Sequence, residues 1–179
     1  MSGTPEKTIQ PASERTLEYQ LEFLKLEFDS INDAISRIDE TTQGTKNWAV
    51  IVWAGSLGIS LGNLELRHYA GLTAMIPLLF WFIDGQWRRI QRSFIFRIQR
   101  ISEFLNGPHL KESFVNQKLV GLEVLDPRGR KHRNTKEYKR FTSIIRTLRF
   151  REVGPFYLGL FAISIIVAAV LRAYPFSPK

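Results

Sequence analysis

The sequence predicts an all-α integral membrane fold with three transmembrane helices, helical cytoplasmic extensions and one small β-hairpin. The apolar residues, 44% of 179, gather in three uncharged stretches, and the rest of the chain is highly polar. An acidic N-terminal segment carries a seven-residue apolar repeat, and a strongly basic segment separates the second uncharged stretch from the third. The absence of cysteine excludes a disulfide framework, a cysteine-ligated metal and thiol catalysis.

The N-terminal part predicts disorder over 1–12 and a cytoplasmic amphipathic helix over 13–46, beginning near Ser13. The spacing of its apolar residues alternates between four and three, which is typical of a helix packed on another helix. A second apolar strip, Tyr19, Phe23 and Leu26, predicts another neighbour. Two interpretations stay open: the seam joins subunits, or it packs on the chain's own cytoplasmic domain. The seam consists of Leu17, Leu21, Leu24, Phe28, Ile31, Ile35 and Ile38.

Three uncharged stretches predict membrane spans. Asn47–Leu64 has 18 residues and Val153–Leu171 has 19, close to the ~20 that cross the hydrocarbon core as a helix. Tyr69–Ile83 has only 15, a length typical of a buried core helix. Because a loop of just seven residues, Gly62–His68, which includes the end of the first stretch, leads into it, we expect both to form a helical hairpin. The predicted segments are transmembrane helices over 47–66, 67–87 and 153–172, and a short outer tail over 173–179.

The basic segment indicates the orientation. Gln86–Glu152 carries 17 Lys and Arg against 6 Asp and Glu, a net charge of +11. The positive-inside rule places it, as a basic domain over 88–152, in the cytoplasm. We therefore expect a multi-pass protein of the bacterial inner membrane with its N-terminus cytoplasmic and its C-terminus outside. The basic patch that we expect to meet anionic lipid or a protein partner, and less readily nucleic acid, consists of Arg88, Arg89, Arg92, Arg97, Arg100, Arg128, Arg130, Lys131 and Arg133.

Inside this basic domain the pattern predicts several short elements. Helical spacing continues from the second span to Leu105, where Asn106-Gly107-Pro108 ends the helix. A short helix over Leu110–Lys118 follows. Leu119–Leu125 then alternates before the type I turn sequence Asp126-Pro127-Arg128-Gly129, which predicts the hairpin. A last helix leads to the third span.

Small residues mark the first span. Two interpretations stay open: they pack against the chain's own helices, or they line a path at a symmetry axis. These residues are Ala54, Ser56, Gly58, Ser60 and Gly62.

The chain offers no catalytic, cofactor-binding or metal-binding constellation. The three histidines, His68, His109 and His132, follow no HExxH spacing, and no glycine-rich phosphate loop is present. We therefore expect no enzyme, no cofactor and no metal. Asp84, at the end of the second span, is interpreted as an ion-pair partner of Arg88 four residues on, with a proton relay as the alternative.

The order of elements over Ser13–Leu105, a polar amphipathic helix, a tight hairpin of spans and a basic amphipathic helix, resembles the two-span SLATT effectors of bacterial defence systems. The resemblance implies a homo-oligomer that breaches the membrane in response to a partner. The sequence thus predicts an oligomeric membrane protein acting as a regulated pore or membrane-perturbing effector. The alternative is a membrane-tethered adaptor or sensor whose basic domain recruits a protein, nucleic acid or anionic lipid.

Overall fold

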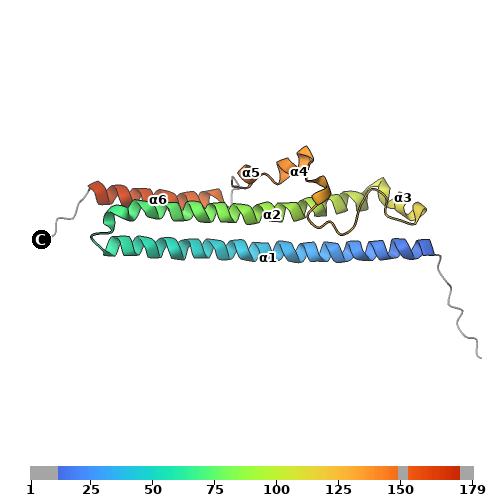
Figure 1. The fold of residues 1–179 in the computed structure, drawn as a ribbon, viewed down its shortest axis with the longest axis horizontal. Coiled ribbons are helices and arrows are strands. Elements are labelled where there is room, and N and C mark those ends of the chain that lie inside the picture. Colours follow the sequence, from blue (N-terminus) through green and yellow to red (C-terminus); the bar gives the residue numbers. More distant parts are fainter. Residues whose placement is uncertain (1–11, 149–152, 174–179) are drawn as a thin grey trace, which may run out of the picture. The chain divides into compact units, whose positions relative to one another are not determined.

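The structure, a computed structural model, describes residues 12–148 and 153–173, and every regular element in these ranges is a helix (Figure 1). The expected disorder over 1–12 and the outer tail over 173–179 fall almost wholly outside the described residues. The elements in chain order are α1 (Ala12–Gly62), η1 (Arg67–Ala74), α2 (Met75–Asn106), α3 (Pro108–Asn116), η2 (Arg130–His132), α4 (Lys136–Phe141), α5 (Ile144–Leu148) and α6 (Gly154–Ala173).

The chain forms two compact units. Unit 1 consists of Met1–Ile35 and Ser93–Tyr138, and unit 2 consists of Ser36–Arg92 and Lys139–Lys179. The two longest helices, α1 and α2, each contribute to both units. The predicted helix over 13–46 and the apolar stretch after it are therefore parts of one helix.

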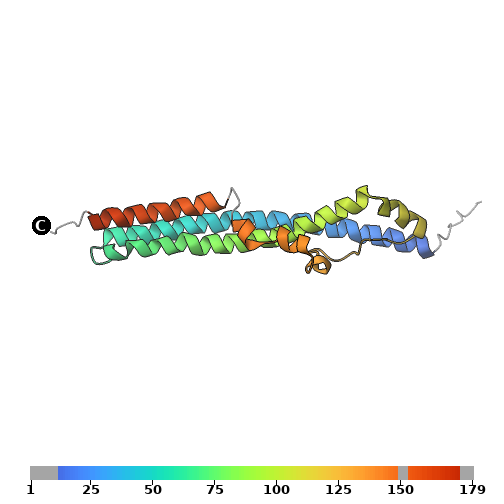
Figure 2. The ribbon, with the colours of Figure 1, turned by 90° about the horizontal axis from the view of Figure 1, so that it is seen from above.

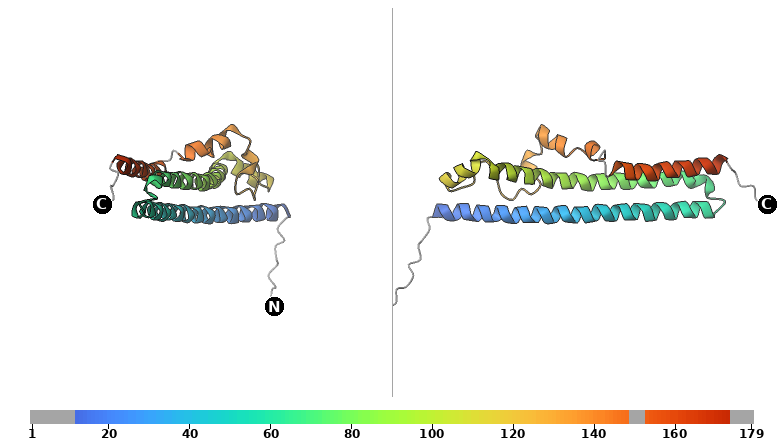
Figure 3. Two further views of the ribbon diagram at one scale, coloured as in Figure 1. Left: turned by 60° about the vertical axis from the view of Figure 1, so that its left-hand side comes forward. Right: turned by 180° about the vertical axis from the view of Figure 1, so that it is seen from behind.

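Unit 1 packs the first part of α1 with the second part of α2 and with α3. Its buried apolar side chains include Leu24 and Ile31 from α1 and Phe104 from α2. The sharp turn between α2 and α3 lies at Gly107, as predicted (Figure 3). A Cβ atom at Gly107 would lie 2.7 Å from the carbonyl oxygen of Glu103, so only glycine fits this turn.

Unit 2 packs α6 beside the end of α1 and beside η1 (Figure 2). Its apolar centre is formed by Ala49, Val153 and Tyr157, all fully buried, with Trp81 packed against them. The indole N–H of Trp81 donates to the carbonyl oxygen of Leu148 at 3.1 Å, which attaches α5 to α2. These contacts fix the chain immediately before and after the residues that lead into α6.

The prediction of three transmembrane helices is wrong: among the described residues, α6 is the only helix long and apolar enough to cross a membrane. Helix α1 ends at Gly62, and its apolar end continues a charged helix that begins at Ala12. In the second stretch, the residues up to Ala74 belong to the 3-10 helix η1. Only nine residues of α2, Met75–Ile83, then precede the charge of Asp84. Both predicted spans are therefore shortened by helix boundaries, at Gly62 and at Ala74, which cannot be recognised from the length of an uncharged stretch.

The prediction of a β-hairpin is also wrong, since residues 119–129 contain no strand. Their backbone N–H groups bond to side chains of neighbouring helices instead of to a second strand. Leu119 donates to Gln20 at 2.8 Å, Val120 to Ser113 at 2.9 Å, and Leu125 to Glu27 at 2.8 Å. The predicted turn is confirmed by the hydrogen bond from the Gly129 N–H to the Asp126 carbonyl at 2.9 Å.

Candidate functional site

The exposed face of α6 is the first candidate surface. Its 20 residues, from Gly154 to Ala173, extend about 30 Å at 1.5 Å per residue, which matches the hydrocarbon thickness of a bilayer. The only charged side chain in this helix is Arg172 in its last turn. Large apolar side chains cover the exposed face: Leu158, Ile163, Ile165, Ile166 and Val170.

Two polar side chains of α6, Tyr157 and Ser164, are buried. Ser164 is fully buried, accepts a hydrogen bond from the Trp53 indole N–H at 2.7 Å and donates to the carbonyl oxygen of Leu160 at 3.0 Å. Tyr157 is also buried and donates its hydroxyl to Asp84 at 3.3 Å. A helix in hydrocarbon requires such internal partners, because lipid offers none. The arrangement leaves an apolar outer face and a polar inner one.

Asp84 is a buried carboxylate with incomplete hydrogen bonding. Its exposed fraction is 0%, Oδ2 accepts from Tyr157, and Oδ1 has no hydrogen bond in the described part of the chain. Burial raises the pKa of Asp84, against the attraction of Lys46 and Arg88 and the Tyr157 hydrogen bond, which lower it. A carboxylate in this setting holds a proton more firmly than one on the surface.

The cation expected to pair with Asp84 binds another residue. Arg88 Nη1 lies 2.9 Å from Asp39 Oδ1 and also donates to Gln91 at 2.9 Å. Gln91 in turn donates to Asp39 at 2.9 Å. These three side chains close a triangle that joins α1 to α2 in unit 2. The i,i+4 interpretation of Asp84 and Arg88 is therefore replaced by a pair across two helices.

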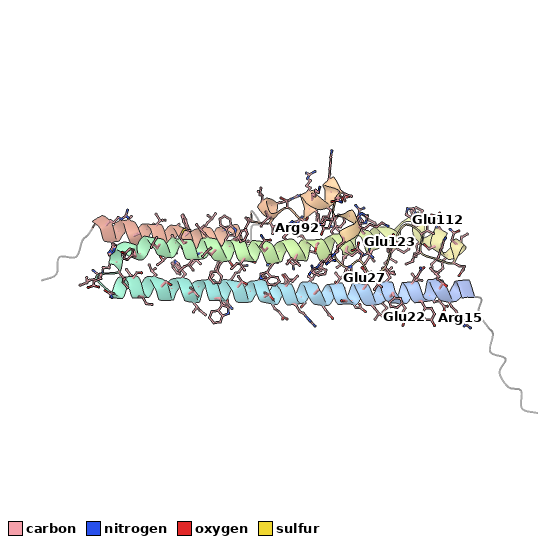
Figure 4. The ribbon with its side chains drawn as sticks, viewed as in Figure 1. Arg15, Glu22, Glu27, Arg92, Glu112 and Glu123 are labelled. Atoms are coloured by element: carbon pink, nitrogen blue, oxygen red, sulfur yellow. The ribbon has the colours of Figure 1, made fainter. Side chains whose placement is uncertain are left out.

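Unit 1 is held by a buried ion pair. Arg97 Nε lies 2.8 Å from Glu27 Oε1, and Nη2 lies 3.1 Å from Oε2, with 2% of each side chain exposed. Arg97 also donates to the carbonyl oxygen of Glu123, and Glu27 accepts the Leu125 N–H. Figure 4 shows Glu27 on the side of α1 that faces the loop with Glu123, whereas Glu22 lies on another side of the helix. The pair thus fastens the loop after α3 to both long helices.

The predicted basic patch does not form one surface. Arg88, Arg89 and Arg92 belong to unit 2, and its other six residues belong to unit 1. Arg97 is buried in its ion pair, and Arg92 lies over the Phe141 ring at 4.2 Å from its centroid. Arg100 pairs with Glu103 and Glu137. The exposed members are Arg89, Arg128, Arg130, Lys131 and Arg133.

The predicted seam is used partly inside the chain. Every second member of the repeat is buried: Leu17, Leu24, Ile31 and Ile38. Leu21 and Ile35 are half-buried, and Phe28 is exposed. The second strip, Tyr19, Phe23 and Leu26, is exposed. Burial of the first set favours the interpretation that the seam packs on its own chain.

The small residues of α1 divide between two sides of the helix. Ser60 is buried and donates to the Ser56 carbonyl at 3.0 Å, and Ser56 is half-buried. Ala54, Gly58 and Gly62 are exposed. A Cβ atom at Gly58 or Gly62 would meet nothing within 4 Å. None of the described residues therefore packs directly on the glycines of this face.

The sequence interpretation missed Glu27, Tyr157 and Trp53, whose partners lie 70, 73 and 111 residues away. One signal was present: Gln20 and Glu27 are seven residues apart beside the apolar seam, and both bind the loop after α3. A polar repeat next to an apolar seam marks side chains that are drawn into the interface.

In the described ranges, no three His, Cys, Asp or Glu side chains are grouped to hold a metal ion. Comparison with family models, curated proteins and solved structures finds nothing that matches this chain.

Proposed function

We propose that this chain is a bacterial inner-membrane protein that is anchored by α6, associates with copies of itself and perturbs the membrane as a regulated pore or effector. The observation that carries the proposal is the pairing of an apolar, open α6 with an unoccupied glycine face on α1. The Trp53–Ser164 hydrogen bond keeps that part of α1 beside α6.

The charges support one orientation. The +11 segment Gln86–Glu152 directly precedes α6, so the positive-inside rule places it, with the N-terminus, in the cytoplasm and the C-terminal end of α6 outside. Exposed arginines near the start of α6, such as Arg140 and Arg146, are suited to anionic headgroups.

Self-association is proposed through the glycine face. Glycine has no side chain, so two helix backbones can approach closely where their glycines meet. Among the residues that the structure describes, nothing lies within 4 Å of the Cβ positions of Gly58 and Gly62, and the exposed Ile51 and Ile59 flank them. A second copy of α1 would cover this face.

The experiment combines leakage with particle mass. Purified protein in liposomes should release a trapped dye, and its detergent-corrected mass should be a multiple of 20.7 kDa. Gly58→Leu with Gly62→Leu should abolish both properties, because leucine separates the backbones. Gly44→Leu is the matched control, since Gly44 also has nothing within 4 Å of its Cβ position and lies on the same side of α1, 18 residues before Gly62. A monomeric mass that the double variant leaves unchanged would refute self-association through this face.

A second candidate is a membrane-tethered adaptor. The exposed Arg128, Arg130 and Arg133 of unit 1 favour it, because they offer cations on one loop region. An adaptor would leave the dye trapped while unit 1 retains an anionic partner.

A further inference from the structure

A cavity in unit 1 is independent of the membrane surface. Its volume is about 320 Å³, within the range of small-ligand sites. It lies between α2 and the segment that follows α3. Its lining residues are Arg97, Leu119, Gly121, Leu122, Glu123, Asp126, Lys131 and His132.

The walls of the cavity are fixed before any ligand arrives. The buried Glu27–Arg97 pair holds the floor, and Glu27 also accepts the N–H of Leu125. Leu125 has φ +66°, a conformation that is uncommon for a residue other than glycine. Asp126 accepts the N–H groups of Arg130 at 2.7 Å and Lys131 at 3.2 Å. A loop held in this way offers a preformed site, which reduces the entropy lost on binding.

In this cavity the acceptor groups already have hydrogen-bond partners, whereas some donor groups have none in the part of the chain that the structure describes. The carboxylates near it are occupied: Glu27 by Arg97 and Leu125, Asp126 by two backbone N–H groups, and Glu123 by Lys131. The hydrogen bonds of Arg97 to the described residues use Nε and Nη2, which leaves Nη1 as its remaining donor group.

His132 adds the second free group. Its ring nitrogens also have no hydrogen-bond partner among the described residues, and its ring lies 5.9 Å from that of Phe96. The groups left for a ligand are therefore an arginine donor and an imidazole, which donates through one nitrogen when neutral and through both when charged.

The surroundings favour an anion. The lining itself carries two cations, Arg97 and Lys131, and two carboxylates, Glu123 and Asp126. The excess positive charge comes from Arg128, Arg130 and Arg133, which are exposed on the segment that forms one wall and raise the local concentration of anions. Arg97 itself is balanced by Glu27, so directed hydrogen bonds at the floor, rather than a net charge there, would hold the ligand.

We infer that this cavity binds a small anionic molecule whose phosphate or carboxylate oxygens accept hydrogen bonds from Arg97 Nη1 and His132. The remaining volume takes the rest of a small organic anion, beside Leu119 and Leu122. This site goes beyond the proposed membrane function, and either can fail without the other.

The test is titration of the full chain in a neutral detergent with inorganic phosphate and with acetate, followed by calorimetry and by the nitrogen resonances of the arginine side chains. Replacing Arg97 would break the buried pair, so His132 is the residue to change. His132→Ala should weaken binding about tenfold, the effect of losing one charge-assisted hydrogen bond. His132→Gln, which keeps a donor, should restore part of it. His68→Ala is the matched control, because His68 lies in unit 2.

Binding of either anion that shifts the Arg97 resonance and depends on His132 supports the site. Displacement of phosphate by phosphatidylglycerol in the micelle would assign the anion to a lipid headgroup, and no displacement would assign it to a soluble molecule. No heat with either anion, or equal affinity in His132→Ala and the wild-type chain, would overturn the inference.

Discussion

Replacing Glu27 by Gln should loosen unit 1 more than any surface substitution. The amide keeps the volume of the side chain but removes its charge. Oε2 accepts from both Arg97 Nη2 and the Leu125 N–H, and an NH₂ group in its place would face two donors. Arg97, 2% exposed, would then be a buried cation without a counter-charge.

The magnitude follows from the burial. Removing one partner of a buried ion pair costs about 3–5 kcal/mol, a large part of the ~5–15 kcal/mol that stabilises a typical domain. With a tenfold change for each ~1.4 kcal/mol, amide exchange in unit 1 should accelerate roughly 100- to 4000-fold. Hydrogen exchange of the full chain, read by mass spectrometry, measures this locally.

The matched control is Glu22→Gln, an exposed glutamate one and a half turns earlier on the same helix. It should change stability by less than about 0.5 kcal/mol. Replacing both partners together, Glu27→Leu with Arg97→Met, should recover much of the loss, because no charge is left buried. Equal exchange rates in Glu27→Gln and Glu22→Gln would refute the assignment of the ion pair as the main fastening of unit 1.

Three further predictions concern unit 2. Gly85→Ala should lower the melting temperature, at a cost of about 1–3 kcal/mol, because the alanine Cβ would lie 2.5 Å from Leu148 Cδ2. Adding Leu148→Ala to that variant should restore the melting temperature. An unchanged melting temperature in Gly85→Ala alone would contradict the close packing of Gly85 on Leu148. Burial raises the pKa of Asp84 in the folded chain above its unfolded value, so the folded state binds the additional proton between these two values and stability falls as the pH rises through them. Asp84→Asn should remove that part of the pH dependence of the denaturation midpoint, and an identical pH profile would argue against it. Ile166→Lys, on the open face of α6, should cost about 2.5–3.5 kcal/mol of membrane insertion and move protein out of the membrane fraction, whereas Ile166→Val should not.

The helical parts of the fold could be predicted where short-range spacing decides them. The repeat around Leu24 and Ile31 placed their side chains correctly on a buried face, and Gly107 with Pro108 marked the end of α2. Both signals depend on residues within a turn or two of each other. Whether the rest of the seam joins subunits stays a prediction.

The errors arise where a distant partner decides the outcome. The alternation over Leu119–Leu125 suits a strand, but Gln20, Ser113 and Glu27 take up the backbone N–H groups that a second strand would need. These acceptors lie on α1 and α3, up to 99 residues away, so no local pattern reveals them.

The same limit applies to the membrane prediction and to Asp84. Uncharged length counts residues but does not show that a helix ends at Gly62 or that a 3-10 helix extends to Ala74. For Asp84, four-residue spacing suggested Arg88, but the triangle with Asp39 and Gln91 occupies that guanidinium. The spacing of residues within one helix does not show that a residue of another helix, here Asp39, binds the same side chain.

The hydrogen bond from Trp53 to Ser164 means that α6 cannot be exchanged for any other apolar helix of the same length. A polyleucine helix of the same length in its place would be equally apolar. It would, however, leave the indole N–H of Trp53 without a hydrogen-bond acceptor in apolar surroundings. A chimaera in which another helix replaces α6 would therefore need a serine at the position of Ser164. That one hydroxyl group would decide whether the replacement helix is tolerated.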